Sequence, residues 1–217
     1  MYYYEGQRGP RPRATTVTPL SGFLRWVVRV LRKPTPVMIE VTYEIPLLRC
    51  VGLLLAIYLA VALSLIVIGE EGLVNFGGGS FAERLQRGVI VAGGLTAGLA
   101  VYVVITHWVA HWLEGVGSLV GLATGAVFSL VPFLLFAAAS LVLGILPIGE
   151  SKSVFQGLVL FVTLGWTAFL YKVAVQENNS FTDVQAVISL LLPPAVLTIS
   201  VGVVFVVGYM LIILFFP

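Results

Sequence analysis

Two histidines one helical turn apart form the pattern in this chain that could do chemistry. His107 and His111 stand at i and i+4, so a helix would place both imidazoles on one face, where they could share a Zn²⁺ ion. Glu114 is the nearest carboxylate, and further zinc ligands are missing nearby. Trp108 and Trp112 beside the histidines are typical of the membrane interface. We expect an interfacial structural role here, with a metal site as the alternative.

The remaining polar residues give no sign of an active site. The aqueous segments contain no GxSxG sequence, no P-loop sequence and no carboxylate pair placed for acid–base catalysis. Transporters coupled to ions or protons keep ionisable groups at mid-depth in the membrane. Here that depth holds hydroxyls instead, which can bond back to their own helix: Ser129, Ser140, Thr163, Thr167, Thr198 and Ser200. We predict that the protein is not an enzyme and has no catalytic residue, cofactor or metal.

Long apolar stretches must position these residues. Each is at least as long as the roughly 20 residues that a helix needs to cross a bilayer core of about 30 Å. Only 10% of the residues are charged and 59% are hydrophobic, whereas a soluble domain carries about 25% charged residues. The fold class predicted is an all-α polytopic membrane protein, with a short amphipathic N-terminal helix and five transmembrane helices: Leu47–Ile68, Val89–Trp108, Leu119–Leu146, Val154–Val175 and Ala186–Phe216.

The basic residues are concentrated before or just inside the first span. Eight of the 12 Lys and Arg residues lie there: Arg8, Arg11, Arg13, Arg25, Arg29, Arg32, Lys33 and Arg49. Basic segments stay on the cytoplasmic side of a membrane. We therefore expect a cytoplasmic N-terminus and, after five spans, a C-terminus outside. No nucleic-acid partner is predicted.

Three segments are expected along the chain. Residues 1–19 form a disordered cytoplasmic tail, 20–45 a basic amphipathic interfacial segment, and 46–217 the five-helix domain. Within the second segment Arg25, Arg29 and Arg32 stand at i, i+4 and i+7 on one helical face. A helix lying in the interface could bring such a face to anionic lipid headgroups. The predicted contacts with the membrane surface are Arg25, Arg29, Arg32 and Lys33, and Pro34 with Pro36 is expected to end the helix.

Prolines and glycines mark special positions inside the spans. Proline removes a helical hydrogen bond, so kinks are expected at Pro132, Pro193 and Pro194, with a re-entrant pair as the alternative. Glycines one turn apart let helix backbones approach closely in lipid. The glycines at this spacing predict an internal packing seam or, alternatively, a homodimer face: Gly94, Gly98, Gly117, Gly121 and Gly125.

Short motifs follow one another in a characteristic order over residues 28–216. They are Arg29-Val-Leu-Arg-Lys-Pro34, Thr106-His107, Leu113-Glu-Gly-Val-Gly117-Ser118, Phe128-Ser-Leu-Val-Pro132, and Asn178-Asn-Ser-Phe-Thr-Asp-Val-Gln-Ala-Val running into Leu192-Pro193. In this order and spacing the chain resembles the Yip1 domain family. The resemblance implies a five-span protein with a cytoplasmic N-terminus.

The chain also departs from the family pattern. Eukaryotic members carry an Asp-Leu-x-Gly-Pro signature before the first span and contact Rab GTPases, and the signature does not occur here. The resemblance therefore implies a prokaryotic member in the plasma membrane. We expect a non-enzymatic scaffold or adaptor in membrane organisation or trafficking-like processes, with membrane-protein partners or a homo-oligomer. A small permease or channel-like protein is the alternative, and a membrane enzyme with a metal at His107 and His111 is the third.

Overall fold

The described part of the chain is entirely helical. The computed structural model describes residues 20–44, 47–68, 80–147, 151–196 and 198, and within them there are helices but no strand. The helices are α1 (Leu20–Arg32), α2 (Pro34–Glu44), α3 (Leu47–Ile68), α4 (Phe81–Trp112), α5 (Leu119–Ser129), α6 (Pro132–Ile145) and α7 (Ser151–Asn179), followed by Asp183–Val196. The all-α prediction is confirmed for these residues. The predicted tail, 1–19, lies outside them.

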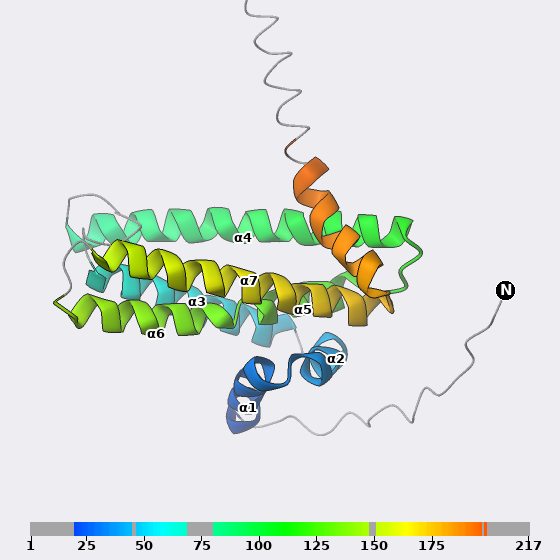
Figure 1. Ribbon diagram of the computed structural model, residues 1–217, viewed down its shortest axis with the longest axis horizontal. Helices are drawn as coiled ribbons and strands as arrows, with labels where there is room; N and C mark the ends of the chain where they lie inside the picture. Colours follow the sequence, from blue (N-terminus) through cyan, green and yellow to red (C-terminus); the bar gives the residue numbers. More distant parts are fainter. Residues whose placement is uncertain (1–19, 45–46, 69–79, 148–150, 197, 199–217) are drawn as a thin grey trace, which may run out of the picture.

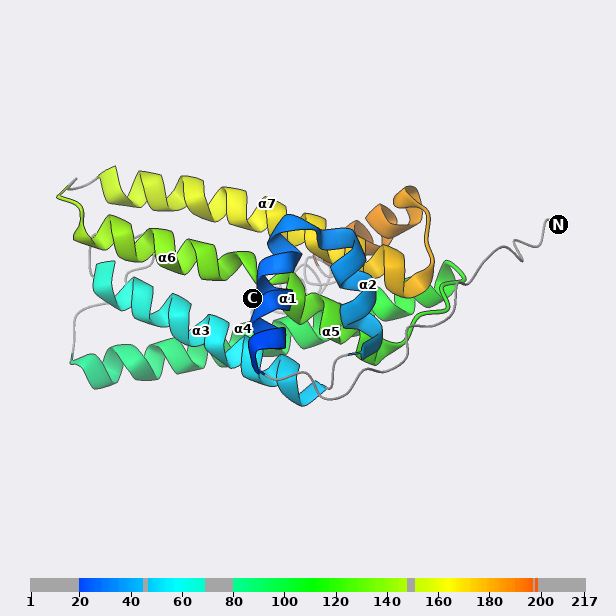
Figure 2. The ribbon, with the colours of Figure 1, turned by 90° about the horizontal axis from the view of Figure 1, so that it is seen from below.

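The long helices lie side by side along one axis. In Figures 1 and 2, α3, α4, α6 and α7 run in roughly the same or opposite directions, and α5 continues the line of α6. Helices α1 and α2 form a hairpin against one side of this bundle, and Asp183–Val196 crosses α4 on another (Figure 1). We call the end of the bundle near Trp112 and Asn179, where α4, α5 and α7 meet, the joint end. The end near Phe81 and Ser151 is the far end.

Three helical segments are long and apolar enough to cross a membrane. They are Leu85–Trp112, Leu119–Ile145 and Ser151–Asn179. Two shorter apolar helices, Arg49–Ser64 within α3 and Asp183–Val196, fall below that length in the described residues. The prediction of a membrane protein with several spans is therefore confirmed, while the count of five is not established. Most of the predicted fifth span, residues 199–216, lies outside the described part.

The helices enclose two hydrophobic clusters. The first joins the α1–α2 hairpin to α3, α5 and α7: Val30, Val37, Met38, Val41, Cys50, Leu53, Ile57, Phe128, Val131, Leu170, Val173 and Ala174. The second joins α4, α5 and α7 to the helix after α7: Val103, Ala110, Leu122, Ala126, Tyr171, Val175, Phe181 and Ala186. Both clusters lie away from the far end of α4, which takes part in neither.

Helix α2 was not expected. The N-terminal helix was predicted to end at Pro34 and Pro36, and α1 does end at Arg32, but a second helix, α2, begins at Pro34. Proline is compatible with the first turn of a helix because the N–H groups there have no helical partner. Val37, Met38 and Val41 are fully buried, so packing against the bundle holds α2 in place. The N-terminal segment is thus a docked hairpin of two helices, of which the sequence predicted the first.

The prolines expected to kink the spans lie either at the start of a helix or inside one. Pro132 is the first residue of α6, and two residues separate it from Ser129, where α5 ends. The chain between them makes i to i+3 bonds, from Leu130 N to Val127 O at 3.1 Å among others, and these tighten the backbone before the missing proline donor. Pro193 and Pro194 lie within the helix Asp183–Val196.

Candidate functional site

The C-terminal ends of α4 and α7 share one backbone motif. Glu114 follows α4 and Ser180 follows α7, and both have positive φ, 64° and 57°. After α4 the Gly115 amide donates to the Ala110 carbonyl at 2.9 Å. This bond across a left-handed residue is the Schellman ending of a helix, which satisfies a carbonyl that would otherwise have no partner.

Gly115 and Phe181 stand at corresponding positions after these two helices and pack against each other. The Phe181 amide donates to the Gln176 carbonyl at 2.9 Å, the equivalent of the bond after α4. A Cβ atom on Gly115 would lie 2.7 Å from Phe181 Cζ and 2.9 Å from Asn179 Oδ1. Because real Cβ atoms do not approach so closely, a side chain at Gly115 would force the Phe181 ring and the Asn179 side chain to shift.

Two buried asparagines at the end of α7 hold the loop between α4 and α5. Asn178 Nδ2 donates to the Ser118 carbonyl at 3.0 Å, and Asn179 Oδ1 accepts from the Gly117 amide at 3.2 Å. Asn179 Nδ2 also donates to the Val175 carbonyl of its own helix at 2.9 Å. Two side chains of α7 thus bond to the backbone of this loop and tie it to α7.

Three glycines let α5 and its preceding loop approach α7 and α2. A Cβ on Gly117 would lie 2.5 Å from the Asn178 carbonyl oxygen, and one on Gly125 would lie 2.6 Å from Ala174 Cβ. A Cβ on Gly121 would lie 3.0 Å from the Thr42 carbonyl oxygen of α2. We call this contact region the glycine joint: Gly117, Gly121 and Gly125, with Ala174, Asn178 and Asn179.

The α1–α2 hairpin is closed by an ion pair. Arg29 of α1 donates to both carboxylate oxygens of Glu40 in α2, at 3.1 and 3.0 Å. Two parallel bonds of this kind fix the geometry of an arginine–carboxylate pair. Arg29 is therefore bonded to Glu40, although the sequence placed it among the contacts to lipid.

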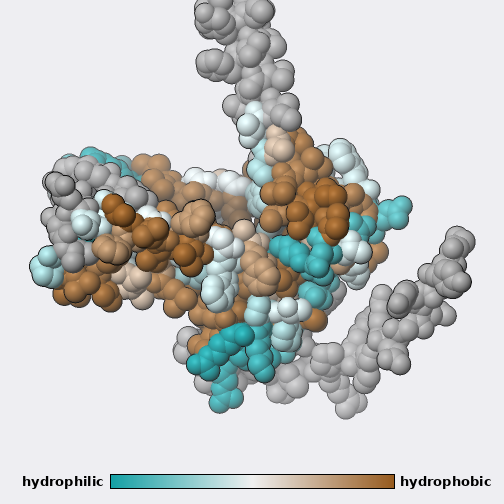
Figure 3. Space-filling view, viewed as in Figure 1, coloured by the Kyte–Doolittle hydropathy of each residue, from teal (hydrophilic) through white to brown (hydrophobic). Residues whose placement is uncertain are grey.

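The other predicted cations lie at the surface of the hairpin. Arg25, Arg32 and Lys33 are exposed, and Figure 3 shows a hydrophilic patch over α1 next to the hydrophobic flanks of the bundle. The structure thus brings these three side chains onto one exposed hairpin whose opposite side is buried in the first hydrophobic cluster. They remain free of the Arg29–Glu40 pair.

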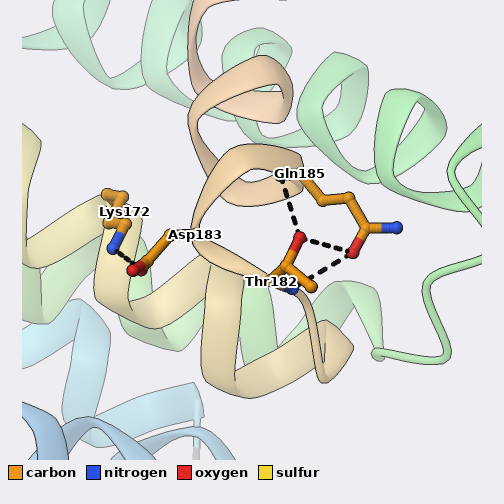
Figure 4. A network of polar contacts seen from close by, with 4 residues as sticks. All are labelled: Lys172, Thr182, Asp183 and Gln185. Atoms are coloured by element: carbon orange, nitrogen blue, oxygen red, sulfur yellow. Dashed lines mark hydrogen bonds and ion pairs between the residues drawn. The ribbon is translucent and has the colours of Figure 1, made fainter.

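A second ion pair fixes the start of the helix after α7 (Figure 4). Lys172 Nζ donates to Asp183 Oδ1. This bond and the ammonium charge hold the pKa of the Asp183 carboxyl below its ordinary value of 3.8. Beside it Thr182 and Gln185 exchange capping bonds: Gln185 N donates to Thr182 Oγ1 at 3.4 Å, and Thr182 N donates to Gln185 Oε1 at 3.1 Å. A capping box of this kind satisfies two amides at the helix start.

The two histidines line a shallow cleft on the exposed side of α4. The rings of His107 and His111 are stacked with centroids 6.4 Å apart, and a cleft of about 240 Å³ lies between them and Trp108 and Trp112. Among the described residues no third His, Cys, Asp or Glu joins them in a group that could hold a metal. The exposed tryptophans suit the interfacial role predicted for this stretch.

Sequence reasoning missed one polar contact inside the bundle. Gln156 in α7 is fully buried, and its Nε2 lies 3.5 Å from the hydroxyl of Ser140 in α6, which is also fully buried. A glutamine inside an apolar stretch is the signal that could have found it, because a buried amide needs partners. The Arg29–Glu40 pair gave no such signal, since both residues are ordinary on a surface helix.

The first predicted glycine pair lies outside the glycine joint. Gly94 and Gly98 are in α4, and a Cβ atom added to either would meet no atom within 4 Å among the described residues. The glycine joint and this open pair are therefore not parts of one seam.

A family model matches most of the chain. The model of the Yip1 domain matches residues 28–205, a range that begins inside α1 and includes α2, the glycine joint and the later helices described above. No match was found among curated proteins or among solved structures. The match covers most of the chain and agrees with the order of motifs in the sequence. The chain belongs to the Yip1 domain family.

Proposed function

We propose that this membrane protein of the Yip1 family is a non-enzymatic scaffold or adaptor that organises membrane lipids and partner proteins. It would span the bilayer five times, with a cytoplasmic N-terminus and a C-terminus outside. The observation that carries the proposal is the docked α1–α2 hairpin. It is held by buried apolar residues and by the Arg29–Glu40 pair, and it leaves Arg25, Arg32 and Lys33 exposed.

The exposed cations suit contact with anionic lipid headgroups. Each Lys or Arg near an anionic membrane surface contributes about 1 kcal/mol of attraction. Arg25, Arg32 and Lys33 belong to one short hairpin, so their contributions can add on one patch. The rigid attachment to α5 and α7 would keep that patch at a fixed position relative to the spans. A partner protein bound there would be held beside the bilayer.

The test measures lipid selection by the whole protein in nanodiscs that contain phosphatidylglycerol and phosphatidylcholine. Reversing the three charges together (Arg25→Glu, Arg32→Glu, Lys33→Glu) is expected to reduce the enrichment of phosphatidylglycerol around the protein, measured by mass spectrometry of the retained lipids. Lys152→Glu at the far end is the matched control and should leave the enrichment unchanged. Equal enrichment in the wild type and the triple variant would contradict the proposal.

A permease is the alternative function, and a flux measurement distinguishes it from a scaffold. Ser129, beside the Pro132 break, donates its hydroxyl to the Ala126 carbonyl of its own helix at 2.6 Å, so it is satisfied locally. Solute flux in proteoliposomes that is lost in Ser129→Ala would favour the permease over the scaffold.

A further inference from the structure

One face of α4 is occupied at one end and open along the rest. Val91, Leu95, Gly98 and Tyr102 stand at i, i+4, i+7 and i+11, so they form a single stripe along the helix. We call these four residues the α4 seam. Leu95 is 60% exposed and Val91 is 49% exposed, whereas Tyr102 at the other end of the seam is half-buried. The bundle therefore covers α4 near the joint end and leaves the far half of the seam bare.

The occupied end of the seam holds the helix Asp183–Val196. Tyr102 donates its hydroxyl to the Leu190 carbonyl at 2.7 Å. In a helix that carbonyl would accept from residue 194, but Pro194 has no N–H. Tyr102 thus satisfies a carbonyl that the proline pair leaves without its helical donor. Ala186 is fully buried in the same contact, so this helix is fixed on α4 just before the prolines.

The chain that follows has the length and composition to cover the open part of the seam. Leu197–Phe216 contains no Asp, Glu, Lys or Arg. Twenty helical residues extend about 30 Å, comparable to the distance from Tyr102 back to the start of α4. Thr198 and Gly202 stand at i and i+4, the spacing of small residues that allows close helix contact in lipid. Gly98 offers the same close approach on the seam, since a Cβ there would meet no atom within 4 Å among the described residues.

We propose that the open part of the α4 seam is the docking face for the chain's own residues 197–216, which run antiparallel to α4. Figure 1 shows Asp183–Val196 crossing α4 steeply, so the chain must turn to follow the seam. Pro193 and Pro194 stand where that turn is needed, and proline pairs kink helices. The proposal rests on the fifth span proposed above and adds the surface against which that span packs. A second copy of the chain is the other occupant that the test must separate.

The test is a cross-link within one chain. Tyr102 faces Leu190; eleven residues back along α4 stands Val91, and eleven residues on along an antiparallel segment stands Val201. In a Cys50→Ala background, Val91→Cys with Val201→Cys is expected to form an intramolecular cross-link in membranes with a short bis-maleimide. The matched control pairs Gly93→Cys with Val201→Cys. Gly93 is also exposed, but it projects from the opposite side of α4, because two residues correspond to about 200°. The control pair should stay uncross-linked.

Other outcomes overturn the proposal. A dimer formed by Val91→Cys alone would assign the seam to a second copy, and equal cross-linking of the test and control pairs would show no defined docking. Reaction of Val201→Cys with a membrane-impermeant maleimide reports separately on the fifth span. If Val201→Cys is protected but the test pair does not cross-link, the span stands and the docking face is wrong.

A second variant tests the seam without cysteines. Gly98→Leu would fill the close approach and is expected to lower the thermal unfolding midpoint of the protein in detergent. Ala100→Leu, exposed on the opposite side of the same helix, should leave the midpoint unchanged. Equal midpoints for the two variants would contradict docking at Gly98.

Discussion

Two sets of glycines with the same spacing meet opposite surroundings in this protein. Gly94 and Gly98 stand one turn apart in α4 and have free space around them among the described residues, whereas Gly117, Gly121 and Gly125 lie against backbone and side-chain atoms of other helices. The spacing makes close approach possible in both places. Other contacts decide which helix comes close. At the glycine joint the asparagines of α7 hold the loop before α5 in place, whereas the described helices leave Gly94 and Gly98 open.

The two sets of glycines should therefore differ strongly in how well they tolerate an added methyl group. Gly117→Ala would place a Cβ 2.5 Å from the Asn178 backbone oxygen, which no side-chain rotation can relieve. We expect the free energy of unfolding to fall by about 3 kcal/mol, at the upper end of the usual cost of overpacking. Titration of the purified protein with a denaturing detergent would measure it.

Gly93→Ala is the matched control for that substitution, because a Cβ at Gly93 meets no atom within 4 Å. Its effect should stay within about 0.5 kcal/mol, as for other surface substitutions. Similar losses in both variants would mean that the joint is no tighter than the open face.

A pair of substitutions sharpens the comparison by exchanging space across the joint. Gly125→Ala would bring its Cβ to 2.6 Å from Ala174 Cβ and should cost about 1–3 kcal/mol. Ala174→Gly removes the atom that it meets, so the double variant should recover much of the loss. Unfolding titrations of the two single variants and the double variant would give the coupling energy. Simple additivity of the two losses would show that these residues do not pack directly in the membrane.

The sequence predicted the helices better than the contacts between them. Long apolar runs and Pro132 indicated the spans and the break between α5 and α6, because span length and proline geometry are local properties. The glycine joint depends on Asn178 and Ser118, which lie 60 positions apart, and no local pattern links them. Helix α2 was missed because a proline is compatible both with the position after one helix and with the first turn of the next, so the residue type alone does not distinguish the two. The expected prokaryotic origin stays a prediction.

The asparagines offer a smaller perturbation of the joint than the glycines. Asn178→Ala would remove the donor to the Ser118 carbonyl at 3.0 Å without adding any atom. The Ser118 carbonyl keeps its bond from the Leu122 amide at 3.0 Å, so the variant loses only the net contribution of one hydrogen bond, about 1 kcal/mol. Ser180→Ala, exposed two residues later, is the control. Hydrogen exchange at the loop amides around Gly117 should rise in Asn178→Ala and stay unchanged in Ser180→Ala. Unchanged exchange in Asn178→Ala would show that this side chain does not hold the loop on α7.

The smallest effect is expected at the Lys172–Asp183 pair, next to the joint but at its surface. Because Lys172 lowers the pKa of Asp183 in the folded protein, the pair stabilises the fold fully above pH 3.8, the ordinary value. That contribution is lost as the pH falls through the lowered pKa of the folded state. The thermal midpoint of the wild type should therefore lose a small increment between pH 5 and strongly acidic solution that Asp183→Asn lacks. Solvent screens an exposed pair, so high salt should shrink the difference between the two proteins. A difference that grows in salt, or one that appears only above neutral pH, would mean that Asp183 acts on the helix start through something other than the charge of Lys172.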